Sequence, residues 1–328
     1  MLNPTASGVS ASIKTGEHDY HLHIGEPHNT GPTTAMTLAA FVALASPAGA
    51  WGFEAHKFIA DRMIALLPPG LEPLFEKRRD FIVERAIDPD LWRNVGWEEE
   101  PPNHFLDFDF EAFGPYPFSA LPREYDAAVQ KFGKAVITEQ GTLPWRAAEF
   151  YGRLQREFAS LKRQPTPGYA VDNIVLYSAI LAHYVADGHV PLHAVVNYDG
   201  QLTGQQGLHS RWEAELFERN RAKLKVAPAP IKPVLNTRDF MFETLLASNR
   251  AAANVLESDK KAAEGREFYD DAYFDGFAAG TLQVMEQRLN DSIAAVAASI
   301  TGAWEQAGRP AIPGEASRTP RRIRRQNP

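Results

Sequence analysis

Histidine and carboxylate side chains recur at one spacing in this sequence of 328 residues. His183 and Asp187 are four residues apart, and His209 and Glu213 repeat that interval. Residues four apart lie on the same face of an α-helix, so each pair could bind one metal ion. His193 follows six residues after Asp187 and could add a further nitrogen ligand.

More candidate ligands precede these pairs. His56 lies five residues after Trp51, Asp90 follows a proline, and His104 comes next. Asp88 competes with Asp90 for the early carboxylate, and the Pro-Asp dipeptide favours Asp90. Each feature alone is more often a surface hydrogen bond or a core residue, but the ordered series is specific. Nitrogen and carboxylate ligands without thiolates suit zinc.

The composition describes an ordinary globular chain and excludes several kinds of site. There are no cysteines, so disulfides, cysteine-zinc sites, iron–sulfur clusters and thiol catalysis are excluded. The hydrophobic content is 44% and the formal net charge is −7. Attachment to nucleic acid by bulk positive charge is therefore not expected, although a local metal centre could still bind a phosphate.

The first 50 residues predict a leader. The apolar run from Leu38 to Ala45 ends in small residues, which is typical of a secretory signal peptide over about 36–50. Cleavage after Ala50 would leave Trp51 as the new N-terminus and would make the protein secreted or periplasmic. A flexible tail leading into the domain is the alternative.

Two further expectations concern the leader. Translation could start at Met1 or at Met36, because residues 1–35 are long for the segment before an apolar run. No apolar run reaches the roughly 18–20 residues that span a bilayer, so we expect no integral membrane segment after signal cleavage.

Helical periodicity dominates the remaining chain, and no run of alternating strands occurs. From Glu54 to Leu67, apolar residues form one stripe before two prolines end the pattern. We therefore predict an all-α fold, with a single mainly helical domain over 51–305 and a flexible basic tail over 306–328. The other amphipathic stretches lie near 71–86, 123–138, 145–162, 171–187, 208–223, 237–257 and 269–304.

The motif series from Trp51 to about Glu218 resembles one superfamily, the zinc-dependent phospholipases C of bacteria and the single-strand-specific nucleases of fungi and plants. The resemblance implies a multi-helix bundle around a trinuclear zinc site. In that family the mature protein begins with a tryptophan whose amino group and carbonyl oxygen bind metal, which matches a cleavage site directly before Trp51. The implied ligand sets are Asp90, His104, His183 and Asp187 for the first ion, Trp51, His56 and the bridging Asp187 for the second, and His193, His209 and Glu213 for the third.

The resemblance also implies a reaction, the hydrolysis of a phosphodiester. Two cations that share a carboxylate activate a water for attack on phosphorus, and a third steadies the leaving oxygen. Arg93 matches a phosphate-facing arginine of the nucleases, with a surface salt bridge as the alternative. Asp107 matches a carboxylate near the attacking water, with support of a ligand or helix capping as the alternative. His189 matches no position of the family, and we expect a surface residue or a residue that supports a ligand.

The sequence leaves the substrate open between two branches of the superfamily. Glu213 in the last ligand position is typical of the phospholipases, whereas the run from Asp90 to Arg93 is more similar to the nucleases. We expect a phospholipid-type diester, with single-stranded nucleic acid and 3′-nucleotidase activity as the alternative, and a monomeric protein. Aromatic residues near the ligands could stack a base or shelter lipid, although we expect more than half in the core: Trp92, Trp97, Phe105, Phe108, Phe110, Phe113 and Tyr116.

A hypothesis of another class is a non-catalytic protein that binds metal for stability. Structural zinc sites are closed, whereas catalytic sites keep an open position. A dry, buried ligand cluster would favour this hypothesis, and ligands around a cleft that reaches solvent would favour the enzyme.

Overall fold

The structure is a computed structural model that describes residues 14–15, 18–19, 52–163 and 168–313. The chain divides into two compact units, Met1–Ala45 and Ser46–Pro328. In the first unit the two-residue strands β1 (Lys14–Thr15) and β2 (His18–Asp19) pair antiparallel.

Several predictions fall on other parts of the chain. The signal peptide over about 36–50, its cleavage site, Trp51 and the basic tail from residue 314 onward lie outside the described residues. Their predictions are therefore not tested by the structure.

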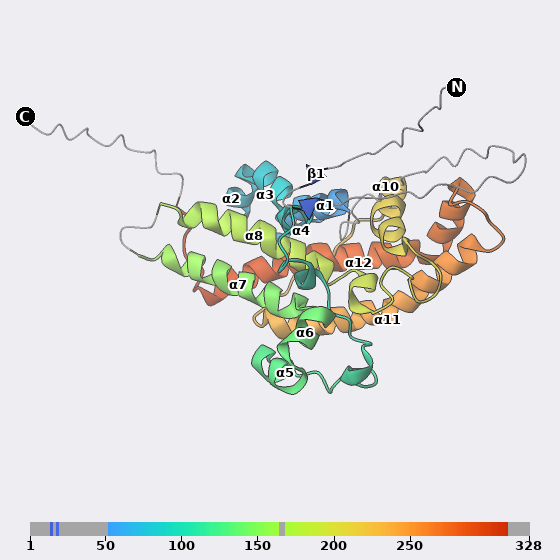
Figure 1. Ribbon diagram of the computed structural model, residues 1–328. Coiled ribbons are helices and arrows are strands. Elements are labelled where there is room, and N and C mark those ends of the chain that lie inside the picture. The colour runs from blue at the N-terminus through green and yellow to red at the C-terminus, as the bar shows by residue number, and fades with distance from the viewer. Residues whose placement is uncertain (1–13, 16–17, 20–51, 164–167, 314–328) are drawn as a thin grey trace, which may run out of the picture. The chain divides into compact units, whose positions relative to one another are not determined.

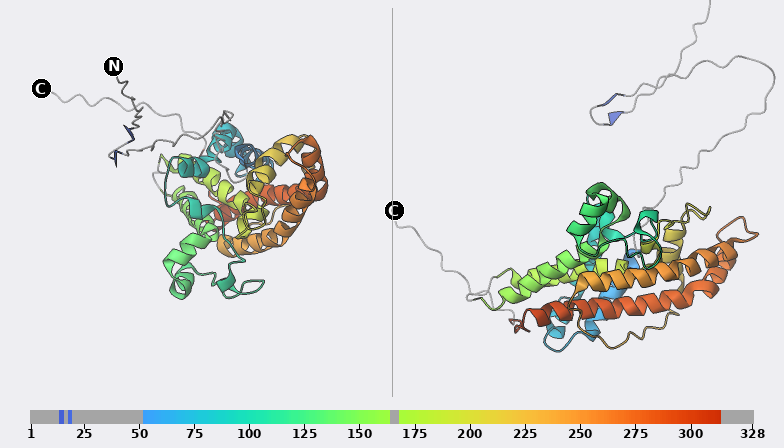
Figure 2. Two further views of the ribbon diagram at one scale, coloured as in Figure 1. Left: turned by 45° about the vertical axis from the view of Figure 1, so that its right-hand side comes forward. Right: turned by 90° about the horizontal axis from the view of Figure 1, so that it is seen from below.

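The second unit is built from helices, which confirms the predicted all-α fold. Four long helices run alongside one another through the middle of this unit (Figures 1 and 2). They are α7 (Leu143–Ser160), α8 (Ala170–Asp187), α11 (Thr237–Ala263) and α12 (Asp271–Gln306).

Local signals explain where these long helices begin. The Asn236 side chain accepts a hydrogen bond from the Asp239 backbone N–H at the start of α11, and Asp270 does the same for Tyr273 at the start of α12. Pro144 lies in the first turn of α7, where a missing N–H costs nothing. Helix α8 is apolar on all sides, and each of its residues from Ser178 onward is buried.

Short elements cover the long helices and carry much of the candidate site. In the view of Figure 1, α1 to α4 lie above α8, and α5 and α6 lie below α7. The short elements are α1 (Phe53–Met63), η1 (Ile64–Leu66), α2 (Glu72–Lys77), α3 (Arg79–Arg85), α4 (Asp88–Asn94), η2 (Pro101–His104), η3 (Glu111–Phe113), α5 (Tyr125–Phe132), α6 (Lys134–Gln140), η4 (Pro191–Ala194), α9 (Leu208–Ser210), η5 (Arg211–Leu216) and α10 (Phe217–Asn220).

The structure corrects the predicted helix boundaries in three places. The stretch near 123–138 is two helices, because Gly133 has a φ of +86° and ends α5. The stretch near 71–86 is likewise interrupted, at Arg78. Helix α4, which carries Asp90, was not predicted.

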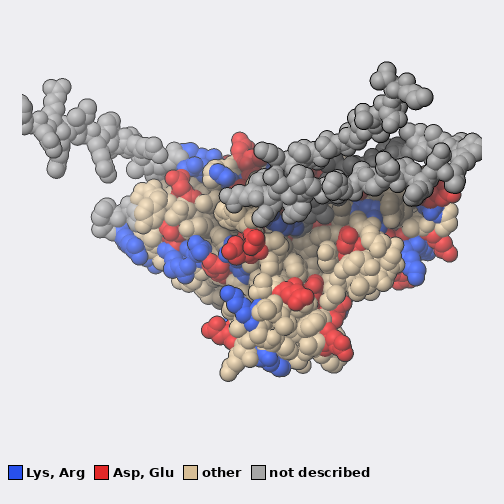
Figure 3. Space-filling view, viewed as in Figure 1, with Lys and Arg blue, Asp and Glu red and all other residues tan. Residues whose placement is uncertain are grey.

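The surface carries both signs of charge. Figure 3 shows acidic and basic side chains intermingled over the described residues of the face in view, as the modest net charge suggests. Within the described residues, no helix combines the length and the apolar character needed to cross a bilayer.

Candidate metal centre

Eight of the nine predicted metal ligands lie in described residues, and all eight are buried. They come from six separate segments of the chain, so only the tertiary fold brings them together. The segments and their ligands are α1 with His56, α4 with Asp90, η2 with His104, α8 with His183 and Asp187, η4 with His193, and α9 with η5 for His209 and Glu213.

Asp187 is the centre of the first group of ligands. Its Oδ1 atom lies 3.2 Å from His56 Nε2, and its Oδ2 atom lies 3.0 Å from His104 Nδ1 and 3.2 Å from His183 Nε2. Asp90 joins through its Oδ1 atom, 3.9 Å from His104 Nδ1. Two sets of three ligand atoms converge closely enough to bind an ion: His56, Asp90 and His183, and His104, His183 and Asp187.

Glu213 is the centre of the second group. Its Oε1 atom lies 2.7 Å from His209 Nε2 and 3.3 Å from His193 Nε2. His193 also links the two groups, because its Nδ1 atom lies 3.8 Å from Asp187 Oδ1. The geometry therefore places the candidate ligands in two adjoining groups rather than scattering them.

Metal coordination explains the positions of these donor atoms better than hydrogen bonds between them do. Both nitrogens of His56 and both carboxylate oxygens of Asp90 and Glu213 are buried without a partner in hydrogen-bond geometry among the described residues. Orphaned buried polar atoms are rare and need an explanation. The nitrogens of His193 and His209 approach to 2.9 Å, near the edge of about 3.3 Å expected for two nitrogens on one tetrahedral zinc. Buried histidine and acidic clusters that could bind metal ions are thus present.

Opposite charges within the first group of ligands offset the cost of burying Asp187 and His104. Burial raises the pKa of Asp187, but the three neighbouring histidines more than reverse that effect and hold it well below its usual value. Burial alone would lower the pKa of His104, but the Asp187 and Glu100 carboxylates outweigh that effect and raise it to about 9. Metal binding at His104 must therefore displace a proton.

The helix α11 and a backbone pairing fix the turn that carries His193. Ser248 Oγ donates to the Gly188 carbonyl oxygen, and Asn249 Nδ2 donates to that of Ala194. The Leu106 N–H donates to the His193 carbonyl oxygen at 3.0 Å. These contacts hold the segment after His104 beside the His193 turn.

Glycines permit two close approaches near the ligands. A Cβ atom on Gly141, which has a φ of +101°, would lie 2.1 Å from the Phe105 carbonyl oxygen. A Cβ atom on Gly52 would lie 2.8 Å from the Ala214 Cβ. The residue that follows Trp51 in the chain is thus packed against the neighbour of Glu213.

The segment η5 is a π-helical turn inside the predicted helix near 208–223. Such turns are rare and frequently occur at functional sites. It begins two residues after His209 and contains Glu213. The wider turn was not predicted, because the apolar pattern of one such turn does not differ from that of an α-helix.

Arg93 and Asp88 have clear partners. Arg93 Nη2 lies 3.1 Å from Asp90 Oδ1, so the guanidinium group contacts a candidate ligand. The Arg93 side chain is also 21% exposed. Asp88 Oδ2 instead lies 3.2 Å from Arg85 Nη1. Asp90, and not Asp88, belongs to the converging groups of the described chain.

Asp107 is buried, lies three residues after His104 in the sequence and belongs to neither group of converging ligands. Its Oδ1 atom has no partner among the described residues. Burial, and next the charge of Asp109, raise the pKa of Asp107 to about 8. A carboxyl group with such a pKa can hold or accept a proton near neutral pH.

Replacing Asp107 with asparagine should stabilise the metal-free protein in a pH-dependent way. The native pKa of about 8 lies above the unfolded value of about 3.9, so ionisation destabilises the native state as pH rises between them. We expect no gain from Asp107→Asn at pH 4 and a gain at pH 9 of at least about 1 kcal/mol, or about 2 °C in Tm. Urea unfolding of both proteins across this range measures it, and a pH-independent difference would contradict the assigned pKa.

The other singled-out residues differ in their burial. His189 is buried, and its Nδ1 atom lies 2.7 Å from the Val185 carbonyl oxygen. Of the two expectations for His189, the surface position is wrong, and the support of a ligand stays a prediction. Of the aromatic residues, Phe108 and Phe113 are in the core, and Trp92 and Phe110 pack against it. Trp97 and Tyr116 are 54% and 46% exposed.

Sequence reasoning missed two acidic residues that contact the candidate ligands. The Asp199 carboxylate accepts hydrogen bonds from the backbone N–H groups of Gly207 and His209 and so fixes the start of α9. Glu100 is 3% exposed and lies beside His104. Burial raises the pKa of Glu100, but the neighbouring His104 ring and the hydrogen bond from Tyr184 lower it below its ordinary value. Glu100 lies four residues before His104. The other pairs have the same spacing, but in them the histidine precedes the carboxylate.

Comparison with known proteins does not add a family. No protein-family model matches the chain. A stretch of 38 residues, 12% of this chain, is 60% identical to the Lon-like protease BrxL of Escherichia coli O9:H4 (strain HS) and spans 6% of that protein. This short match says nothing about the candidate ligands, and the resemblance to the zinc-dependent phospholipases C and nucleases stays a prediction.

Proposed function

We propose that this protein is a zinc-dependent phosphodiesterase. The observation that carries the proposal is the convergence of eight buried histidine and acidic residues in two adjoining groups linked by Asp187 and His193. Donor sets of nitrogen and carboxylate oxygen are the ones that zinc binds in hydrolases.

In this proposal the two groups of ligands would hold three zinc ions, and Asp187 would be a ligand to two of them. When bound, zinc would polarise a phosphoryl oxygen and lower the pKa of a water. The amino group and carbonyl oxygen of a freed Trp51 would complete the ligand set.

Two side chains of the chain would act on the substrate directly. Arg93, which is paired with Asp90 and partly exposed, would bind a non-bridging phosphate oxygen. Asp107 Oδ1 would accept the proton of the attacking water and return it to the leaving alkoxide as the phosphorus–oxygen bond breaks. The orphaned Oδ1 atom and the raised pKa of Asp107 support that role.

A phospholipid-type diester is the substrate we propose first, because glutamate occupies the last ligand position, as in the phospholipases. Single-stranded nucleic acid is the second candidate. Trp97 favours it, because this half-exposed ring stacks on Trp92 at 5.4 Å and could extend the stack to an unpaired base.

A comparison of substrates tests the proposal. One preparation is assayed on phosphatidylcholine, denatured DNA and RNA, with zinc and with a chelator. We expect zinc-dependent hydrolysis of phosphatidylcholine, at least about tenfold faster than that of either nucleic acid. The reverse order would assign the nuclease activity, and failure on all three substrates would contradict the proposed function.

A secreted or periplasmic location follows from the same proposal, because a ligand amino group on Trp51 requires cleavage before it. N-terminal sequencing of the exported protein should begin at Trp51. An uncleaved chain with full zinc content would contradict this part of the proposal.

One observation favours the non-catalytic hypothesis. Asp90, His183, Asp187 and Glu213 have no exposed surface, and the most exposed candidate ligand, His209, is only 8% exposed. The substrate comparison separates the two hypotheses, because a structural metal centre would raise the thermal stability without hydrolysing any of the three substrates.

A further inference from the structure

Glu100 lies on the opposite side of the His104 ring from the candidate ligands. His104 Nδ1 faces the cluster, 3.0 Å from Asp187 Oδ2 and 3.1 Å from His183 Nε2. His104 Nε2 faces away from it and lies 3.5 Å from Glu100 Oε1. His104 Nε2 is buried and has no hydrogen-bond partner among the described residues, so Glu100 is the acceptor available to it.

A histidine that binds metal through one ring nitrogen carries its proton on the other, and that proton needs an acceptor. His183 already has one, because its Nδ1 atom lies 2.8 Å from the Ala86 carbonyl oxygen. We propose that Glu100 is the positioning residue for His104: it accepts the proton of Nε2 and thereby presents Nδ1 to the metal. This inference rests on the proposed metal centre.

The remaining contacts of Glu100 hold its carboxylate in place. The Tyr184 hydroxyl donates to Oε1 at 2.5 Å, and Arg146 Nη2 and Asn103 Nδ2 donate to Oε2, each at 3.2 Å. Arg146 Nε also donates to the Tyr184 oxygen at 3.1 Å. The 3.5 Å separation from His104 is long for a hydrogen bond, and a ring movement of about 0.5 Å would close it.

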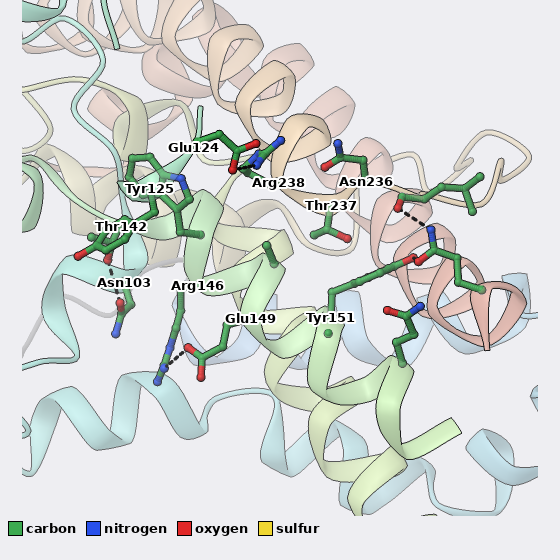
Figure 4. Close-up of a pocket in the computed structure, with 16 residues that line it drawn as sticks. Asn103, Glu124, Tyr125, Thr142, Arg146, Glu149, Tyr151, Asn236, Thr237 and Arg238 are labelled. Atoms are coloured by element: carbon green, nitrogen blue, oxygen red, sulfur yellow. Dashed lines mark hydrogen bonds and ion pairs between the residues drawn. The ribbon is translucent and has the colours of Figure 1, made fainter. Parts of the chain in front are cut away.

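Two of the residues that donate hydrogen bonds to Glu100 have further hydrogen-bond partners in a pocket. Arg146 and Asn103 line a pocket of about 800 Å³, shown in Figure 4. In this pocket Arg146 Nη1 donates to Glu149 at 2.9 Å, and Thr142 Oγ1 donates to Asn103 Oδ1 at 2.8 Å. A continuous set of polar contacts therefore runs from this pocket to the ring of His104.

The burial of Glu100 argues for a specific role. It is the last of three consecutive glutamates, and Glu98 and Glu99 are exposed. Removing a carboxylate from water is unfavourable unless partners compensate. A carboxylate that only kept this segment folded could have stayed in solvent like its two neighbours.

The variant Glu100→Gln tests the inference through zinc affinity. Glutamine keeps the size of the side chain but removes its charge, and replacing such a partner typically weakens metal binding about 10- to 100-fold. The zinc-free protein is titrated with zinc in competition with a chromophoric chelator. Glu99→Gln is the matched control, with the same change on the adjacent exposed residue, and we expect it to keep the unaltered affinity.

The outcomes separate this inference from the proposed function. If the unaltered protein binds no zinc, the proposed metal centre is wrong. If it binds zinc and Glu100→Gln binds it equally tightly, the centre stands and the role of Glu100 is refuted. Equal loss of Tm with and without zinc, at unchanged affinity, would assign Glu100 a structural role only and would also refute the inference.

A measurement on the unaltered protein covers the case in which Glu100→Gln does not fold. Two-bond ¹⁵N–¹H spectra of the zinc-loaded protein, labelled at histidine, report which nitrogen of each ring carries a proton. We expect His104 to carry it on Nε2 alone. A proton on Nδ1 would overturn the inference.

Discussion

Replacing Asp187 with asparagine should remove zinc from the first group of ligands and abolish hydrolysis. The Asp187 carboxylate is fully buried and lies within 3.2 Å of ring nitrogens of His56, His104 and His183. Asparagine offers one oxygen and no charge, so it cannot serve two cations. We expect the loss of about two of three zinc ions and a fall in kcat of about a thousandfold or more.

Metal analysis and a steady-state assay of the same preparation measure both effects. Asp172→Asn is the matched control, because Asp172 lies on the same helix α8, is 60% exposed and is paired with Arg78. Loss of that surface pair should change stability by less than about 1 kcal/mol and leave the zinc content intact. Full zinc content and unchanged turnover in Asp187→Asn would refute the bridging role.

Removing the metal should lower the Tm by about 8–16 °C. The candidate ligands come from helices far apart in sequence, so zinc binding at the proposed centre would be coupled to the packing of those helices. One site held at a thousand times its Kd contributes about 4 kcal/mol, and each kcal/mol shifts Tm by about 2–4 °C in a domain of this size.

Differential scanning calorimetry with and without a chelator measures this shift. Added zinc should restore the original Tm, and Asp187→Asn should show a smaller response to the chelator than the unaltered protein. A Tm that is independent of the chelator would show that the buried cluster binds no metal that matters for stability.

The long helices and much of the candidate site could be predicted from the sequence. The periodicity of α7, α8, α11 and α12 is strong because each buries a continuous apolar face or is buried on all sides. The spacing of His183 and Asp187 in α8 was a reliable guide for the same reason, since residues four apart on a regular helix share a face.

Other features depend on contacts that local patterns do not encode. The break at Gly133 depends on one residue and the π-helical turn η5 spans six, and a period averaged over several helical turns registers neither. Helix α4 is only seven residues long, too short for the periodic pattern to be clear.

Glu100 shows most clearly why the rest of the site was missed. In the sequence it ends a run of three acidic residues, which normally indicates a solvated surface. Only the approach of Tyr184 and Arg146, residues distant in sequence, buries this carboxylate and places it beside His104. The burial of such a group is decided by tertiary packing.

Anomalous diffraction at the zinc absorption edge, from crystals of the protein purified without added metal, tests the central claim most directly. We expect three peaks: two at the group formed by His56, Asp90, His104, His183 and Asp187, and one at His193, His209 and Glu213. Peaks confined to the surface, or none at these buried side chains, would contradict the metal centre and the phosphodiesterase proposed from it.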